Sequence, residues 1–473
     1  MPQKSEEERN PIDKGEPVTP SEKYLDRLCL GTFLSLWSYP AIYRDQRAVG
    51  TNGDGKEVCD HLVVFGNDVI IFSDKHCQFP KGPDLVVSWK RWFRRAIESS
   101  AEQALGAERW IRQFPNRLFI DRLCTKKFPI ELPACDKMQF HLVVVAHGIS
   151  EIARESLGGS GGMAVNAAIK GLLNHEKPFQ IGDLDPEKTF VHVLDDDSLE
   201  LLLTQRDTIS DFVSYLGKRA SFLRGSPVVA APGERQLLAL YMVGLDEKNQ
   251  HDFILPPGAD TEPFVQVPDW LWTHFQSQPE RIAQLKQDQV SYLWDDLIEK
   301  CNKHVLEDTQ YFRPEGGLKD SETILRFMAK EPRFMRRFLS RTLLEMVQIT
   351  PKDKRRLRVW KPDYPGQPHY VFLLFPHPPS ISEKVYREVR QRYLHASCMV
   401  AKLGNPDATH IIGFATESDP DNVERSEDFC FLDATEWPEK LQQEARKLQK
   451  EFQILVNPIV IAGRISEFPK PPN

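Results

Sequence analysis

Several features that would define a function class are missing from this 473-residue sequence. Its eight cysteines are scattered and include no CxxC pair, which favours reduced thiols over a disulfide framework. The first twenty residues hold no apolar segment of the signal-peptide type, and no apolar run approaches the length of a membrane span. We therefore expect a cytoplasmic protein that makes no membrane contact.

An excess of positive charge is also missing. The net charge is −7, so the chain as a whole is not attracted to nucleic acid, and any such binding must depend on local basic patches. We find no internal repeat and no long low-complexity tract in the sequence.

Apolar runs and helical patterns alternate along the chain, which predicts an α/β fold. Its length predicts two or three domains. We expect a disordered leader over residues 1–20, an α/β domain over 21–230 and a C-terminal unit over 231–473. Within that last unit, 270–345 is predicted to be helical and 355–473 to be α/β.

One predicted hairpin carries the most chemistry. Two apolar runs, at about 57–65 and 68–74, flank a Gly66-Asn67 turn, which is a strong hairpin signal. Antiparallel pairing across that turn should bring Asp60 close to Asp74, with Lys75 beside them. Carboxylates at strand ends suit Mg²⁺, which lowers the pKa of bound water, and a nearby amine suits the charge that builds on a phosphate.

The order of these residues resembles the PD-(D/E)XK nuclease superfamily over about residues 20–150. The resemblance rests on a helix with Glu22, a strand with Asp60, a strand ending in Asp74-Lys75 and a second helix with Gln103. "KEVCDHLVVFGNDVIIFSDK" is similar to nuclease-related versions of this fold. The resemblance implies a restriction-endonuclease-like mixed sheet flanked by helices, with Mg²⁺ or Mn²⁺ bound by Asp60 and Asp74. It also implies that Lys75 assists the attacking water, that Glu22 contacts metal through water and that Gln103 steadies the site.

The sequence departs from that pattern at one position. Side chains alternate along a strand, so Ser73 and Lys75 should share a face while Asp74 points to the other. A β-bulge at Ser73–Lys75 would restore Asp74 to the site, and we predict one. Without it, Asp68 or Glu57 would have to supply the ligand, or the fold would be inactive, or the hairpin end would have no catalytic meaning.

Two basic stretches are candidate nucleic-acid surfaces. "SWKRWFRRA" interleaves basic and aromatic residues, and residues 326–360 hold 11 Lys/Arg against 3 Asp/Glu. Solvated helix faces with aromatic residues in the core would look the same. The predicted contacts to phosphates are Lys90, Arg91, Arg94, Arg95, Arg336, Arg337, Arg355 and Arg356.

Other motifs have a simpler interpretation. The G-x-S-x-G pattern around Ser160 follows a predicted helix instead of a strand, so we expect a loop and not a nucleophile elbow. Cys59, His61, His76 and Cys77 match no trusted zinc spacing and are expected to pack or hydrogen-bond. His147 is expected to be a satisfied core histidine, and "LDDDS" at 194–198 an acidic turn.

The sequence therefore predicts a Mg²⁺- or Mn²⁺-dependent nuclease that acts on nucleic acid, with DNA favoured over RNA. By analogy with the family, its role would be prokaryotic defence against foreign DNA. The alternative is a nucleic-acid-binding or regulatory protein on a degenerate nuclease scaffold. The C-terminal half would recognise substrate or a partner, and the sequence leaves homo-oligomerisation open.

Overall fold

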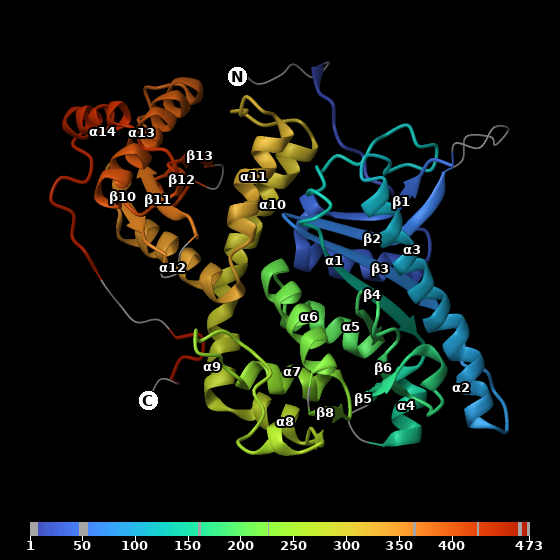
Figure 1. Cartoon of the computed structure of the whole chain (residues 1–473). Helices are drawn as coiled ribbons and strands as arrows, with labels where there is room; N and C mark the ends of the chain where they lie inside the picture. Colours follow the sequence, from blue (N-terminus) through green and yellow to red (C-terminus); the bar gives the residue numbers. More distant parts are fainter. Residues whose placement is uncertain are drawn as a thin grey trace.

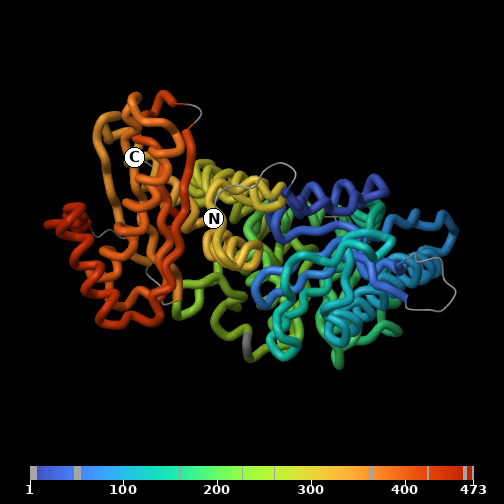
Figure 2. Tube along the Cα trace, turned by 90° about the horizontal axis from the view of Figure 1, so that it is seen from above, coloured from blue at the N-terminus to red at the C-terminus, as the bar shows by residue number. Residues whose placement is uncertain are grey.

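The computed structural model describes residues 8–46, 55–158, 162–225, 227–362, 366–422, 425–461 and 466–470. The chain is mixed α/β, as predicted, with an N-terminal body, a helical middle and a C-terminal α/β unit (Figure 1). Seen at right angles to this view, the helical middle lies between the other two parts (Figure 2). None of the helices within those ranges is both long and apolar enough to cross a membrane. Ser160 lies outside the described residues.

The N-terminal sheet contains five strands in the order β1-β2-β3-β4-β7. β1 to β3 are antiparallel neighbours, whereas β3, β4 and β7 run parallel, so their carboxyl ends meet at one edge of the sheet. The strands are β1 (Ser38–Arg44), β2 (Lys56–Phe65), β3 (Asp68–His76), β4 (Gln139–His147) and β7 (Val191–Asp195).

The predicted β2–β3 hairpin is confirmed. Gly66 adopts a positive φ of 60° in the two-residue turn, a conformation that a residue without Cβ adopts at little cost. Phe65 pairs with Asp68 across the turn, and the ladder continues to the pair His61 and Phe72. Beyond that pair β2 and β3 no longer pair with each other, which leaves backbone groups of β3 open to other partners.

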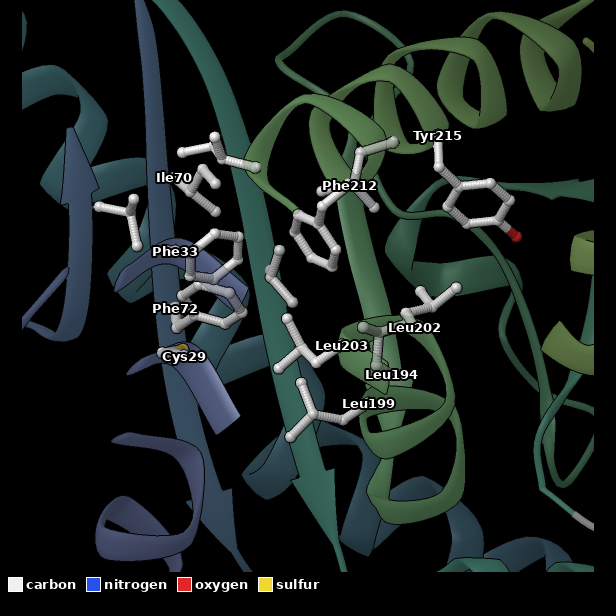
Figure 3. Packing of buried hydrophobic residues seen from close by; sticks show 14 of the residues in the cluster. Cys29, Phe33, Ile70, Phe72, Leu194, Leu199, Leu202, Leu203, Phe212 and Tyr215 are labelled. Carbon is white, nitrogen blue, oxygen red and sulfur yellow. The ribbon is translucent and has the colours of Figure 1, made fainter. Parts of the chain in front are cut away.

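Helices cover both faces of this sheet. α1 (Pro20–Trp37) begins with a capping box between Thr19 and Glu22. On the face of the sheet that α1 covers, Phe72 lies against Phe33 of α1 and Phe212 of α6 (Ile209–Arg224), within a buried apolar cluster (Figure 3). The opposite face is covered by α3. The remaining helices of this body are α2 (Leu85–Phe93), the π-helical turn Arg94–Glu98, α3 (Ser99–Gln113), α4 (Ser150–Leu157), α5 (Asp196–Gln205), α6 (Ile209–Arg224) and α7 (Glu234–Val243).

A second sheet crosses the predicted domain boundary near residue 230. Its order is β6-β5-β8-β9, formed by β5 (Ala164–Lys170), β6 (Gln180–Asp183), β8 (Val228–Ala231) and β9 (Phe264–Gln266). Because β8 and β9 pair in parallel, the N-terminal body continues past residue 231.

The helical middle connects to the C-terminal unit. The middle helices are α8 (Leu271–Ser277), α9 (Pro279–Asp288), α10 (Tyr292–Leu306), α11 (Leu318–Ala329) and α12 (Arg333–Ile349). Short 3₁₀ turns lie at Leu172–Asn174, Ala259–Thr261 and Gln289–Ser291. The C-terminal unit has the sheet order β10-β11-β12-β13. It consists of β10 (Arg356–Trp360), β11 (His369–Phe375), α13 (Glu383–Gly404), β12 (His410–Glu417), β13 (Asp428–Asp433) and α14 (Glu439–Phe452).

The predicted disordered leader needs correction where it is described. The Ile12 amide donates to the Leu306 carbonyl at 2.8 Å, and the Lys14 ammonium donates to the Ser38 carbonyl at 2.7 Å. Residues 12–14 are therefore held against α10 and the end of α1. Charge and proline content predicted disorder, but these partners lie far along the chain and leave no local signal.

Candidate functional site

Strand β3 contains no bulge at Ser73–Lys75. Its register with β4 runs without a shift from Asp68 opposite Gln139 to His76 opposite His147. The predicted bulge is therefore wrong, and strict alternation holds along β3. Because Phe72 faces α1, Asp74 lies on that same side of the sheet, whereas Ser73 and Lys75 lie on the α3 side.

The Asp74 carboxylate is bound to His147. Its side chain is 1% exposed, and Oδ1 meets Nε2 of His147 at the end of β4. The other ring nitrogen of His147 meets Oδ1 of Asp196, whose second oxygen accepts from the Gly148 amide at 2.9 Å. The imidazole thus bridges two carboxylates at the edge where the parallel strands end.

Charge explains how this bridge is held together. Burial alone would favour neutral imidazole, but the bonds to Asp196 and Asp74 outweigh it and raise the pKa of His147 to about 9. At neutral pH a buried imidazolium therefore lies between two carboxylates. His147 is satisfied, as the sequence predicted, and Asp74 is committed to it on the side of the sheet away from Lys75.

Asp60 lies at the end of the β2–β3 hairpin, as predicted, but it contacts the backbone of β3. Its Oδ2 accepts from the Asp74 amide at 2.6 Å, just beyond the point where the ladder ends. His61 faces Phe72 on the α1 side, so alternation directs Asp60 to the side of Ser73 and Lys75. Asp60 and Asp74 are thus close, as expected. The contact, however, is between the Asp60 carboxylate and the Asp74 backbone amide, and not between two carboxylates.

Several acids surround Asp60. Burial raises its pKa to about 7, against the effect of the Asp74 amide, and repulsion from Glu57, Asp74 and Glu22 adds to that rise. Loss of hydration and repulsion from Glu22 also raise the pKa of Glu57, while the nearby Arg122 opposes the rise. A divalent cation bound among these groups would relieve the repulsion.

The predicted acids do not form a compact ligand set. Glu22 Oε2 accepts from the Val18 and Thr19 amides at 2.8 and 3.1 Å, so part of its carboxylate caps α1. In the described part of the chain, no three of the predicted acids bring ligand atoms within 4.8 Å of one another. Asp68 bonds His141 at 2.8 Å at the far end of β3, which excludes it as the replacement ligand.

Three polar side chains share the α3 side of the hairpin with Asp60. The Ser73 hydroxyl donates to Gln103 Oε1 of α3 at 3.4 Å. Lys75 is exposed, and its ammonium makes no ion pair with any residue that the structure describes. The structure therefore brings Asp60, Ser73, Lys75 and Gln103 to one side, with a hydroxyl where the family pattern has an acid.

The first basic stretch separates its charged residues from its aromatic ones. Trp89, Trp92 and Phe93 are buried and pack on one another, so they cannot stack on bases. Their basic neighbours are exposed: Lys90, which pairs with Glu176 at 2.6 Å, and Arg91, Arg94 and Arg95. In this stretch, therefore, the basic side chains can contact phosphates, but the aromatic side chains cannot stack on bases.

The second basic stretch needs a correction. Arg336 and Arg337 are 1% and 0% exposed and pair with Asp295 and Asp288, so they support the fold and do not form a surface. The pattern of charges along a helix in the sequence does not show whether an arginine is solvated or pairs with a buried acid that is distant in sequence. In the same stretch, Arg355 lies over the Tyr393 ring, and the Arg356 guanidinium donates to Thr350 Oγ1 at 2.8 Å.

Sequence reasoning missed Asp196 as a partner of His147. A signal was present, since both residues directly follow apolar runs typical of buried parallel strands, whose carboxyl ends share an edge. The simpler interpretation of the cysteine–histidine group agrees with the structure: Cys59 is buried, and His61 Nε2 bonds Ser38 Oγ at 2.6 Å. No family model, curated protein or solved structure matches this chain.

Proposed function

We propose that this chain is a metal-dependent nuclease whose reaction centre lies on the α3 side of the β2–β3 hairpin. The observation that carries the proposal is the charge around Asp60. A carboxylate that is buried beside other acids, and whose pKa rises to about 7, fits a site that binds a cation. Carboxylate oxygens are the ligands that Mg²⁺ and Mn²⁺ prefer.

The polar residues near this end of the hairpin have separate proposed roles. Asp60 and Glu57 would hold the cation, while Glu22, which caps α1, would add negative charge. When bound, the cation lowers the pKa of a coordinated water and offsets charge on the phosphate. The exposed Lys75 ammonium stabilises the negative charge that develops on the scissile phosphate, and Gln103 fixes Ser73 beside it.

Asp74 has a different proposed role from the one its sequence position suggested. Its amide fixes the Asp60 carboxylate, and its own carboxylate is anchored by His147. We assign Asp74 as a positioning residue: its bond to His147 holds the end of β3 in place, so that its amide can bind the Asp60 carboxylate. Replacing its side chain should therefore affect the site through the protein's stability.

The proposed substrate is DNA, as in the defence nucleases that the sequence pattern resembles. Exposed Arg91, Arg94 and Arg95 support this proposal, because they lie on the helical segment that leads directly into α3 and Gln103. Guanidinium groups there would contact phosphates without reading the sequence. Such contacts give salt-dependent affinity.

A nucleic-acid-binding protein on an inactive nuclease scaffold is the second candidate. Two observations favour it: Ser73 replaces the expected acid, and β3 has no bulge that would bring Asp74 back. This candidate predicts binding without cleavage.

Cleavage assays separate the two candidates. Purified protein is incubated with supercoiled DNA, linear DNA and RNA in Mg²⁺ or Mn²⁺, beside Asp60→Asn and Lys75→Met. Lys81→Met is the matched control, because Lys81 is also exposed. Cleavage that Asp60→Asn and Lys75→Met abolish and Lys81→Met retains supports the nuclease. Retained DNA binding with no cleavage in either metal supports the scaffold.

A further inference from the structure

A second group of potential metal ligands lies in the C-terminal unit. Glu417 is the last residue of β12, and His377 follows the end of β11 by two residues. β11 and β12 are parallel, with Phe375 opposite Glu417, so both side chains lie at the carboxyl edge of the pair. Glu383 joins them from the first turn of α13. Open α/β sheets bind ligands at this edge.

The three ligand atoms converge. His377 Nδ1 lies 3.6 Å from Glu383 Oε2 and 4.0 Å from Glu417 Oε1. All three atoms lie within 4.8 Å of one another. Ligands about 2.1 Å from a tetrahedral ion are separated by about 3.4 Å, so small side-chain movements would close the shell.

Groups outside the cluster hold the other polar atom of each ligand. His377 Nε2 donates to the Ile381 carbonyl at 3.0 Å. Ser426 Oγ donates to Glu383 Oε1 at 2.8 Å, and Asn422 Nδ2 donates to Glu417 Oε2 at 2.6 Å. Such outer bonds orient ligands in metal sites, and the bond from Nε2 leaves the lone pair of Nδ1 facing the two carboxylates.

The surroundings of the Glu417 carboxylate indicate that this cluster would accept a cation. Its residue is 4% exposed, yet within the described ranges no lysine or arginine pairs with it, and Oε1 accepts no hydrogen bond there. A buried carboxylate ordinarily has a cationic partner. Glu417 Oε1 lies 4.0 Å from His377 Nδ1, and a cation shared between the Nδ1 lone pair and this oxygen, whether a proton or a metal ion, would satisfy both atoms.

We propose that His377, Glu383 and Glu417 bind a divalent transition-metal ion, with Zn²⁺ as the best match. One imidazole and two carboxylates suit Zn²⁺ better than Mg²⁺, which avoids nitrogen ligands. Glu383 is 51% exposed, so the site opens to solvent on that side. Three protein ligands and an open position are typical of sites where the metal holds water or substrate. This site is independent of the proposed nuclease centre.

Metal titration of the full chain tests the proposal. Co²⁺ serves as a spectroscopic probe and Zn²⁺ as the competitor, and the variants are Glu417→Gln, His377→Gln and, as control on the same helix, Glu388→Gln. With excess Mg²⁺ present to occupy the proposed Asp60 site, we expect one further Co²⁺ per chain, with visible bands that Zn²⁺ displaces. Glu417→Gln and His377→Gln should weaken binding at least about 10-fold, since even outer-shell changes have effects of this size.

The controls make each outcome decisive. Glu388→Gln should bind Co²⁺ like wild type, and far-ultraviolet circular dichroism should show all variants folded. Equal binding by wild type and Glu417→Gln would overturn the proposal, because the metal would then be held elsewhere, for example by free thiols. Absence of a one-to-one Co²⁺ complex in folded wild type would overturn it as well.

Discussion

Replacing Asp60 by asparagine should stabilise the protein at alkaline pH while it removes the proposed activity. The amide has nearly the volume of the carboxylate, and its oxygen can still accept from the Asp74 amide. What disappears is a negative charge beside Glu57, Glu22 and Asp74. A charged residue that lowers the stability of the fold is typical of a functional site.

The sign and size of this effect follow from the pKa. An acid whose pKa is raised by folding costs nothing below its ordinary value of 3.8; the cost grows between that pH and the folded value of about 7 and is constant above it. The full difference corresponds to about 4 kcal/mol. Relaxation of the site and water penetration reduce it, so we expect about 2 kcal/mol in favour of Asp60→Asn at pH 8.

Urea unfolding at several pH values measures this difference. Wild type and Asp60→Asn are compared at pH 5, 6, 7 and 8 without divalent metal, with exposed Asp136→Asn as control. The advantage of Asp60→Asn should grow between pH 5 and 7 and level off by pH 8. Saturating Mg²⁺ should then stabilise wild type, by about 2.7 kcal/mol at 100 times the Kd, and leave Asp60→Asn unchanged. An advantage that is absent, or that does not grow with pH, would refute the charge argument.

Asp74→Asn should lower the free energy of unfolding by about 3–5 kcal/mol, because it leaves one side of the buried His147 imidazolium unpaired. Chemical denaturation of the variant and wild type measures this loss, and an unchanged midpoint would contradict the ion bridge. The stabilisation from His147 should be complete below pH 6.5 and disappear as pH rises through about 9, so His147→Gln and wild type should converge in stability above that pH. Arg336→Met should destabilise the fold by about 3 kcal/mol, because Asp295 would keep only Arg333 as a partner and the Glu331 and Ala329 carbonyls would lose a buried donor; a neutral result in thermal unfolding would contradict this reasoning. Combined substitution of Arg91, Arg94 and Arg95 by Gln should weaken DNA binding and lower the slope of log affinity against log salt by up to about 2.7, measured by fluorescence anisotropy, with no change in thermal stability.

The local pattern of the sequence determined the secondary structure around the site. Gly66-Asn67 between two apolar runs specified the hairpin, and the alternation along "VIIFSDK" specified which side of the sheet each side chain faces. These features depend on neighbouring residues and on a fixed period of two, so no distant contact is needed to predict them. The family pattern alone required the bulge at Ser73–Lys75, and β3 does not contain it.

Only the tertiary structure decided which partners the charged residues acquired. Asp74 meets His147 across 73 positions and Asp196 joins them from the start of α5, while Arg336 meets Asp295 on another helix. Likewise, the approach of His377 to Glu417 depends on the pairing of β11 with β12. Charge pairing depends on the packing of elements that are distant in sequence, and burial then decides whether a charge serves the surface, the fold or a site. The sequence by itself determined the hairpin and the side of the sheet on which Asp60 and Lys75 lie. The tertiary structure assigned Asp74 to an ion bridge and left Asp60 with an unbalanced charge.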